Sequence, residues 1–132
     1  MIRYEYDYLV SGVDLVTIQL GENASDISTF ESDYIELVNH IKERCPDVNI
    51  VIIDDFWDTS RGEMRKAAAK ETGAGFVDLS DIRGQSEYRL GMNAIVYDAE
   101  GQEHVNKHYG VSKHPNDKGM EVIAERVLED IK

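Results

Sequence analysis

Apolar residues follow two alternating patterns along the chain. Short runs of β-branched and other apolar residues are typical of buried strands, whereas apolar residues three or four positions apart are typical of amphipathic helices. The strand pattern covers residues 14–20, 49–53, 75–79, 94–97 and 103–105. The helix pattern covers residues 27–44, residues 62–72 and the segment from Pro115 onward. This alternation predicts an α/β fold with a mainly parallel sheet and helices on both of its faces.

Breaks in these patterns predict where the elements end. Pro46 follows the first helical segment, and Gly73 is expected to cap the second. Asp98-Ala99-Glu100-Gly101 separates the last two strand patterns and predicts a turn between two short strands. The polar residues 80–92 predict a loop. The first ten residues leave two interpretations open, because their apolar residues alternate as in a strand while some could also line one face of a helix.

The composition narrows the class of protein. A chain of 132 residues predicts a single domain over residues 1–132, and its net charge of -12 disfavours nucleic acid as a partner. Cys45 is the single cysteine and cannot form an internal disulfide, so we expect a structural role for it. No apolar stretch approaches the roughly 20 residues of a membrane span. The chain begins without a signal-peptide pattern, so we expect a cytoplasmic location and no membrane partner, with secretion open if the true N-terminus lies upstream.

Polar segments follow the predicted strands where parallel sheets form their binding sites. Gly21-Glu22-Asn23 comes after the first strand, Asp54-Asp55-Phe56-Trp57-Asp58 comes after the second, and His114 stands just before the last helix. The carboxyl ends of parallel strands meet at one edge of a sheet. We therefore expect these three segments to lie close together.

Two of these segments resemble signature blocks of the SGNH (GDSL-like) esterase and acylhydrolase superfamily. Residues 14–23, Asp-Leu-Val-Thr-Ile-Gln-Leu-Gly-Glu-Asn, are similar to the third block, in which a strand delivers a glycine and an asparagine to the active site. Residues 114–120, His-Pro-Asn-Asp-Lys-Gly-Met, are similar to the fifth block, in which a histidine precedes the final helix. The resemblance covers nearly the whole chain. It implies a three-layer α/β/α, flavodoxin-like fold of the SGNH-hydrolase type, N-terminally truncated to its C-terminal two-thirds.

The resemblance also implies a role for each site residue. Asn23 would donate an amide N–H to the tetrahedral oxyanion of ester hydrolysis, Gly21 would shape its loop, and Glu22 would contact substrate. His114 would take the proton of a serine nucleophile and return it to the leaving alkoxide. Trp57 could line a substrate or carbohydrate pocket, or pack under the sheet edge. The implied substrates are small-molecule acyl or acetyl esters, including esters of carbohydrates, with no cofactor and no metal.

The chain also departs from the family pattern. The family's nucleophilic serine lies in a Gly-Asp-Ser block on its first strand, followed by a second block with a glycine donor, and neither block occurs in the 132 residues. The family's acid three residues before the histidine corresponds to Val111. Ser25, Ser60 and Ser112 lie near the predicted site, but we expect each of them to be a cap or loop residue. The nucleophile would therefore come from outside the chain, if it is present at all.

The missing first strand has a physical consequence. In the family sheet that strand neighbours the one equivalent to residues 14–20, so its absence would leave an apolar edge strand exposed to aggregation. The N-terminal tyrosine-rich segment could cover this edge, two copies could pair across it, or an upstream polypeptide could supply the strand. We expect a homo-oligomer or a missing N-terminal segment in preference to a self-sufficient monomer.

The sequence also leaves two other interpretations of the protein's function open. The chain could be a non-catalytic form of the fold that binds a ligand or partner, or a flavodoxin-like receiver or binding module with Asp54 and Asp55 at a strand end. Asp54, Asp55 and Asp58 could hold a divalent cation through oxygen ligands, but we expect solvated carboxylates. His104 and His108 are four residues apart without a helix signal around them, so we expect no zinc site there.

Overall fold

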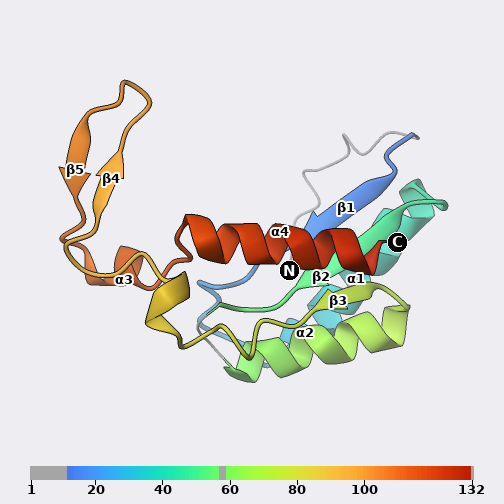
Figure 1. Ribbon diagram of the computed structural model, residues 1–132. Coiled ribbons are helices and arrows are strands. Elements are labelled where there is room, and N and C mark those ends of the chain that lie inside the picture. The colour runs from blue at the N-terminus through green and yellow to red at the C-terminus, as the bar shows by residue number, and fades with distance from the viewer. Residues whose placement is uncertain (1–11, 57–58, 132) are drawn as a thin grey trace.

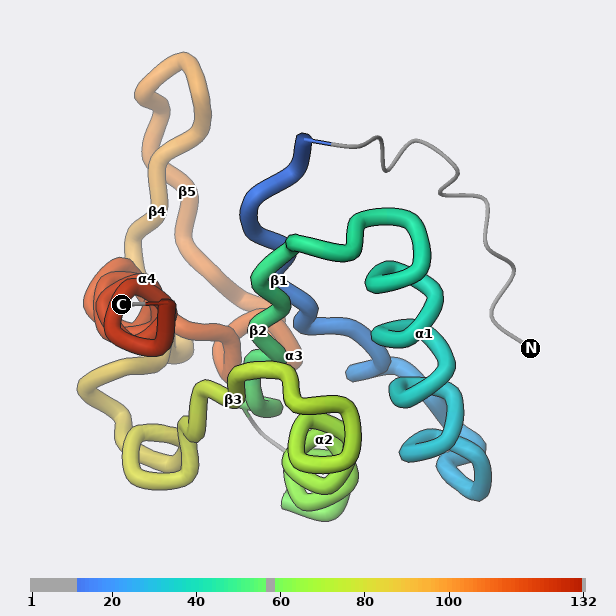
Figure 2. Tube along the Cα trace, turned by 90° about the vertical axis from the view of Figure 1, so that its right-hand side faces the viewer, coloured from blue at the N-terminus to red at the C-terminus, as the bar shows by residue number. Residues whose placement is uncertain are grey.

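The computed structural model describes residues 12–56 and 59–131, and its centre is a small parallel sheet. Strands β1 (Leu15–Ile18), β2 (Asn49–Ile53) and β3 (Gly75–Val77) lie in the order β1-β2-β3. Val16 pairs with Ile50, and Ile52 pairs with Phe76. Helices α1 (Phe30–Arg44) and α2 (Thr59–Thr72) cover one face, and α4 (Asp117–Asp130) covers the other, as the views in Figures 1 and 2 show. The prediction of an α/β fold with parallel strands and helices on both faces is confirmed.

The central strand β2 divides its side chains between two apolar cores. Ile50 and Ile52 point toward α1 and α2, whereas Val51 and Ile53 point toward α4. This alternation is the period of two that a strand imposes on its side chains. Because both faces of β2 are buried, its sequence is a nearly continuous run of apolar residues. The prediction of residues 49–53 therefore matches the observed strand.

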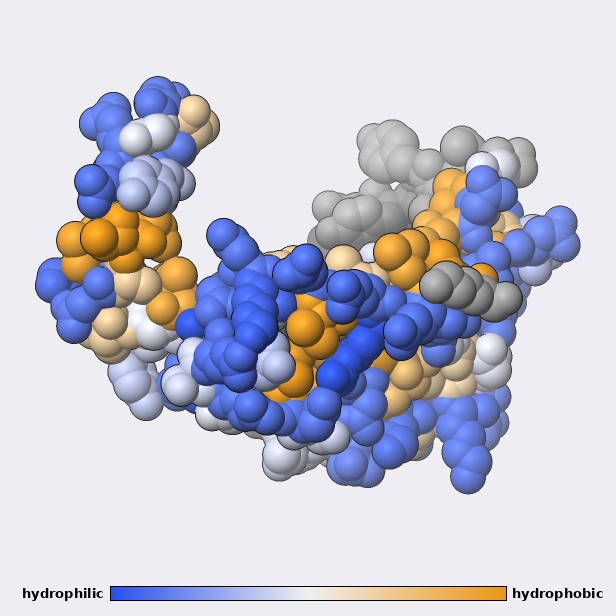
Figure 3. All heavy atoms as spheres, viewed as in Figure 1, coloured by the Kyte–Doolittle hydropathy of each residue, from blue (hydrophilic) through white to orange (hydrophobic). Residues whose placement is uncertain are grey.

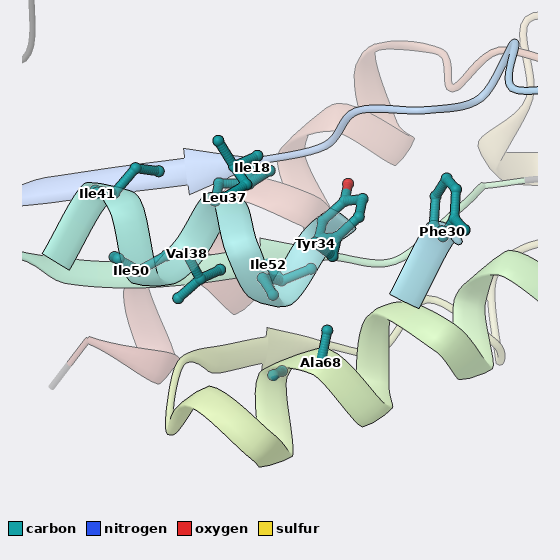
Figure 4. Close-up of a cluster of buried hydrophobic side chains, with 10 residues drawn as sticks. Ile18, Phe30, Tyr34, Leu37, Val38, Ile41, Ile50, Ile52 and Ala68 are labelled. Carbon is teal, nitrogen blue, oxygen red and sulfur yellow. The ribbon is translucent and has the colours of Figure 1, made fainter. Parts of the chain in front are cut away.

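Helix α1 buries one stripe of its surface against the sheet. Figure 4 shows this stripe facing Ile18, Ile50 and Ile52 of the sheet and Ala68 of α2. The helix ends at Cys45, whose backbone N–H donates to the carbonyl of Ile41 at 2.8 Å and whose side chain is buried. The cysteine is thus a packed residue at a helix end, in line with its expected structural role. The buried residues of the stripe are Phe30, Tyr34, Leu37, Val38 and Ile41.

The first strand is shorter than the pattern of residues 14–20 predicts. After Ile18 the chain leaves the sheet, because its next polar groups bond to other elements. The Gln19 side chain donates to the carbonyl of Asp54 at 3.1 Å, and the Leu20 backbone bonds to the Tyr34 hydroxyl through both its N–H and its carbonyl. Among the described residues β1 pairs only with β2, which places it at an edge of the sheet as expected. The ambiguous first ten residues lie outside the described residues.

A hairpin stands away from the sheet and its helices. Strands β4 (Ile95–Tyr97) and β5 (Glu103–Val105) pair antiparallel, with Ile95 opposite Val105, and Figure 1 shows them projecting beyond the start of α4. The predicted turn at Asp98 is confirmed, since its carboxylate accepts backbone N–H groups of Glu100 and Gln102 at 3.0 and 2.8 Å. The short helices η1 (Ser86–Tyr88) and α3 (Tyr109–Ser112) flank the hairpin in the chain. No helix in the described part of the chain is long and apolar enough to cross a membrane.

Candidate active site

A cavity of about 170 Å³ lies at the carboxyl ends of β1 and β2. It brings together the three segments that chain order predicts to meet at this edge of the sheet. Glu22 represents the first segment, Asp55 the second and His114 the third. Its lining residues are Gln19, Glu22, Asp55, Phe56, Arg65, Lys113, His114, Pro115 and Met120.

The loop after β1 turns at a residue that must be glycine. Gly21 has a φ of +88°, which side chains rarely adopt. A Cβ atom at this position would also lie 2.5 Å from Cε2 of Phe30. The backbone N–H of Ala24 donates to the carbonyl of Gly21 at 3.1 Å and closes the turn. The predicted loop-shaping role of Gly21 thus has a local physical basis in backbone geometry and in the packing of α1.

Two arginines of α2 and one tyrosine of α1 hold this loop from behind. Arg61 Nη1 donates to the carbonyl of Gly21 at 3.2 Å and also to the carbonyl of Glu22. The hydroxyl of Tyr34 donates to the carbonyl of Leu20 at 2.8 Å, and the Arg65 guanidinium donates to the same carbonyl. These bonds fix the path of the backbone that presents Glu22 to the cavity.

Asp55 and Arg65 form a fully buried ion pair beside the cavity. Arg65 Nη1 lies 3.1 Å from Asp55 Oδ2, and each side chain is 1% exposed. Arg65 Nε donates to the Tyr34 hydroxyl at 3.1 Å, and its guanidinium carbon lies 5.3 Å from the centre of the Phe30 ring. Burial tends to lower the pKa of Arg65, but Tyr34 and Asp55 raise it above its usual range. Arg65 keeps its charge in the interior because its guanidinium has hydrogen-bonding partners there.

Asp54 is the second buried carboxylate at the end of β2. It accepts the backbone N–H groups of Asp55 and Leu79 at 2.7 and 3.2 Å and pairs with the Arg83 guanidinium. Burial raises the pKa of Asp54, while the Leu79 N–H and the charge of Arg83 lower it in part. The prediction of solvated carboxylates is wrong for Asp54 and Asp55, because nearby arginines on α2 and on the loop after β3 neutralise them inside the protein. Asp58 lies outside the described residues.

These ion pairs also bear on the predicted alternative that the aspartates bind a divalent cation. Asp55 Oδ2 lies 3.4 Å from Arg61 Nε in addition to its bond to Arg65. Within residues 12–56 and 59–131, no three histidine, cysteine, aspartate or glutamate side chains come together as metal ligands. His104 lies on the hairpin, where its Nε2 is 2.8 Å from Asp98 Oδ2, and His108 caps α3. The aspartates at the end of β2 therefore serve as anchors for arginines.

Two backbone hydrogen bonds hold His114 in its position at the cavity. Its N–H donates to the carbonyl of Val111 at 3.1 Å, and its carbonyl accepts the N–H of Leu90 at 2.9 Å. Asn116 then caps α4 by accepting the N–H of Gly119 at 2.9 Å. A Cβ at Gly119 would lie 2.5 Å from the carbonyl oxygen of Tyr88, so glycine lets α4 approach this loop. Much of the motif after His114 thus has a structural role in placing the histidine.

The structure places the predicted site residues at different depths. Glu22 and His114 both line the cavity. Gly21 lies behind Glu22 against Phe30, and Asn23 is exposed next to Glu22 without lining the cavity. Trp57, the predicted pocket residue, lies outside the described residues.

None of the described residues that line the cavity is a serine or a cysteine. Ser112 is buried in α3 and its hydroxyl donates to the carbonyl of Tyr109 at 2.6 Å. Ser25 and Ser60 are exposed and do not line the cavity. Val111, at the position of the family's acid, is 41% exposed in α3. The expectation that these serines are cap or loop residues holds for Ser25, which lies in the loop after β1, and is wrong for the other two, because Ser60 is the second residue of α2 and Ser112 is the last residue of α3.

Sequence reasoning missed several residues that build the site. Arg61 and Arg65 are four residues apart and therefore face the same side of α2, and this spacing next to a run of alanines could have marked them as inward-facing. Lys113, which precedes the histidine block, and Met120, its last residue, also line the cavity. Comparisons with protein-family models, with curated proteins and with solved structures gave no match. The resemblance to SGNH hydrolases therefore rests on the two sequence blocks alone.

Proposed function

We propose that the cavity is an ester-hydrolysis site of the SGNH type, acting on short acyl or acetyl esters, including those of carbohydrates. The observation that carries the proposal is that His114 and Glu22, which belong to the two resembling blocks, line the same cavity although they lie far apart in the chain. The cavity has about 170 Å³, below the roughly 300–1,000 Å³ of pockets for drug-sized ligands, so it would accept only a small group. The proposed substrate is therefore a small-molecule ester.

The fold part of the proposal is a flavodoxin-like arrangement of the SGNH type. It is supported by the parallel order β1-β2-β3, with α1 and α2 on one face and α4 on the other. It is also supported by the position of the cavity at the carboxyl ends of the strands, where open α/β sheets bind their ligands. In this arrangement β1 would be the strand next to the one that carries the nucleophile.

Each proposed role follows from the chemistry of the side chain. His114 would accept the proton of the attacking hydroxyl and return it to the leaving alkoxide, a contribution of roughly a hundredfold to ten-thousandfold in rate. Asn23 is exposed beside Glu22 and does not line the cavity, so its side chain would turn toward the oxyanion when substrate binds, where one such donor contributes roughly 3–4 kcal/mol. The bonds from Arg61 and Tyr34 support this proposal, because they hold the loop that carries Asn23 in place before substrate binds.

A second function is favoured by a specific feature of the same cavity. Its described lining contains neither serine nor cysteine, so the mechanism needs a nucleophile from another segment or from another chain. Without that nucleophile the cavity would bind a small ester or its acid product and not turn it over. The alternative function is therefore a non-catalytic ligand- or partner-binding domain with the same site residues.

Labelling with a fluorophosphonate probe separates the two functions. The probe reacts with an activated serine, and peptide mass spectrometry then locates the modified residue. Ester hydrolysis predicts one labelled serine, with labelling lost in His114→Ala and retained in His104→Ala, a control on the hairpin whose side chain is 57% exposed. No label in the wild-type chain, together with saturable binding of acetate esters, would establish the binding function instead.

A further inference from the structure

Two charged side chains of the cavity have no ion-pair partner within residues 12–56 and 59–131. Glu22 and Lys113 both line the cavity, and neither forms an ion pair with the other or with another described residue. The buried charges beside them, Asp55 and Arg65, lie 3.1 Å apart and neutralise each other. The cavity therefore presents one positive and one negative charge to a molecule that enters it.

Lys113 is held in place without being neutralised. Its Nζ lies 4.5 Å from the centre of the Tyr109 ring, a contact that orients the ammonium group but brings no negative charge. The chain has a net charge of -12, and Figure 3 shows mainly hydrophilic side chains over α4. In this acidic protein the cations Arg65 and Arg83 pair with buried aspartates, whereas the half-buried Lys113 does not. Its ammonium group is therefore available to an anionic group of a ligand.

Glu22 supplies the opposite charge from another segment. The Arg61 guanidinium donates to the backbone carbonyl of Glu22, so this bond fixes the main chain and leaves the carboxylate available. Glu22 lies in the loop after β1, whereas Lys113 lies between α3 and α4. The two charges therefore reach the cavity from different parts of the chain.

The rest of the lining limits the ligand to a small molecule. The cavity has a volume of about 170 Å³, and Phe56, Pro115 and Met120 give it an apolar wall. A ligand with a single charge would bind one of the two charged side chains and be repelled by the other. A small zwitterion would bind both, because each of its charged groups meets an opposite charge.

We propose that the cavity binds a small α-amino acid in its zwitterionic form, with the carboxylate on Lys113 and the ammonium group on Glu22. Under the proposed ester hydrolysis, on which this part rests, the amino acid is the alcohol half of the ester and carries a short acyl group on its side-chain hydroxyl. Hydrolysis adds the hydroxyl group of water to the acyl carbon and its proton to the side-chain oxygen, which releases a short acid and the free amino acid. His114 follows Lys113 directly and lines the same cavity, so the ester bond would lie beside the imidazole.

Three probe molecules separate the two charges in an NMR titration. L-Serine carries both charges, ethanolamine lacks the carboxylate of serine, and 3-hydroxypropionate lacks its ammonium group. Amide chemical shifts of the full chain at neutral pH give the affinity for each probe, and the same spectra report whether a variant is folded. Serine should bind at least roughly tenfold more tightly than either of the other probes, because each of these loses one charge-assisted hydrogen bond.

Single substitutions assign each charge of the ligand to its side chain. Lys113→Met should lower the affinity for serine roughly tenfold, toward that of ethanolamine, without weakening the binding of ethanolamine. Glu22→Gln should lower the affinity for serine toward that of 3-hydroxypropionate, without weakening the binding of 3-hydroxypropionate. Lys107→Met and Glu100→Gln are the matched controls, because both side chains are exposed and neither lines the cavity. The controls should leave all three affinities unchanged.

Serine that binds no more tightly than the singly charged probes, or that shows no saturable binding, would overturn the proposal. Equal weakening of all three probes by Lys113→Met and by Glu22→Gln, or equal effects of the control substitutions, would also overturn it. Binding is measured without turnover, so the amino-acid site and ester hydrolysis can fail separately. A chain that hydrolyses p-nitrophenyl acetate without binding serine would refute the amino-acid site alone. A chain that binds serine without hydrolysing esters would support the amino-acid site and refute ester hydrolysis.

Discussion

Arg65 of α2 reaches Asp55 at the end of β2 in an ion pair of 3.1 Å from which water is excluded. The same guanidinium bonds the hydroxyl of Tyr34 and the carbonyl of Leu20. One side chain therefore links α1, α2, β2 and the loop after β1. The candidate site is built on this linkage, because the loop that presents Glu22 and Asn23 starts at Leu20.

Replacing Arg65 by methionine should destabilise the protein strongly. The change would remove the shorter ion pair of the buried Asp55 carboxylate and leave it with Arg61 at 3.4 Å, so the loss should approach the roughly 3–5 kcal/mol of unfolding free energy that breaking a buried pair costs. Urea denaturation measures this loss. Lys66→Met is the matched control, because Lys66 is 56% exposed and lies 3.8 Å from Asp78, a surface pair worth less than about 1 kcal/mol. Equal losses of unfolding free energy in the two variants would show that the buried pair stabilises the protein no more than the surface pair does.

The effect of pH on stability should reveal the buried carboxylate of Asp54. Burial raises its pKa above the ordinary value of 3.8, so the folded protein holds this proton more tightly than the unfolded chain. The contribution of Asp54 is therefore fully present below pH 3.8 and is lost as pH rises through the raised pKa. The unfolding free energy of the wild type relative to Asp54→Asn should fall over this window in urea titrations. A rise in this free-energy difference with pH would mean that pairing with Arg83 lowers the pKa of Asp54 more than burial raises it.

Gly21→Ala should cost more than an alanine at another glycine with positive φ. A side chain at a positive φ costs about 1–2 kcal/mol, and at Gly21 the new Cβ would also press on the ring of Phe30. Gly73→Ala is the control, because Gly73 has a φ of +70° and no atom within 4 Å of the added Cβ. Thermal unfolding should show the larger loss for Gly21→Ala. Equal losses would remove the argument that Phe30 fixes this turn.

Asn116→Ala should weaken the start of α4 and the loop that leads into it. The cap alone is worth about 1 kcal/mol. The Asn116 amide also donates to the carbonyls of Glu87 and Arg89, at 2.9 and 3.1 Å. Asn116→Ser keeps a hydroxyl acceptor for the cap and removes these donors without placing an oxygen against the two carbonyls, so urea denaturation should place it between the wild type and Asn116→Ala. A serine variant as unstable as the alanine variant would show that the cap itself contributes nothing.

The sequence predicts the helices and strands whose formation depends on residues close together in the chain. Residues 49–53 are predicted at their observed bounds, because the strand is apolar on both faces and ends at two aspartates. The helix after Pro115 is predicted because its apolar spacing is regular, and its cap at Asn116 is local too. The meeting of Glu22 and Asp55 follows from chain order, because parallel strands end at one edge of the sheet. His114 reaches the same edge from outside the parallel sheet, since it follows the separate hairpin and α3 in the chain.

What the sequence does not predict depends on contacts between distant residues. Asp54 and Asp55 look solvated in the sequence, because their partners Arg65 and Arg83 lie on other elements. The early end of β1 depends on Tyr34 in the same way, since the tyrosine hydroxyl bonds the backbone of Leu20. Pairings of this kind between side chains far apart in sequence leave no periodic pattern in the chain.

The rate of p-nitrophenyl acetate hydrolysis by the purified chain tests the proposed site most directly. The account predicts turnover that falls roughly a hundredfold or more in His114→Ala, the contribution expected of a general base, and that is unchanged in the hairpin control His104→Ala. Hydrolysis that persists in His114→Ala, or that falls equally in both variants, would contradict a catalytic role for the cavity.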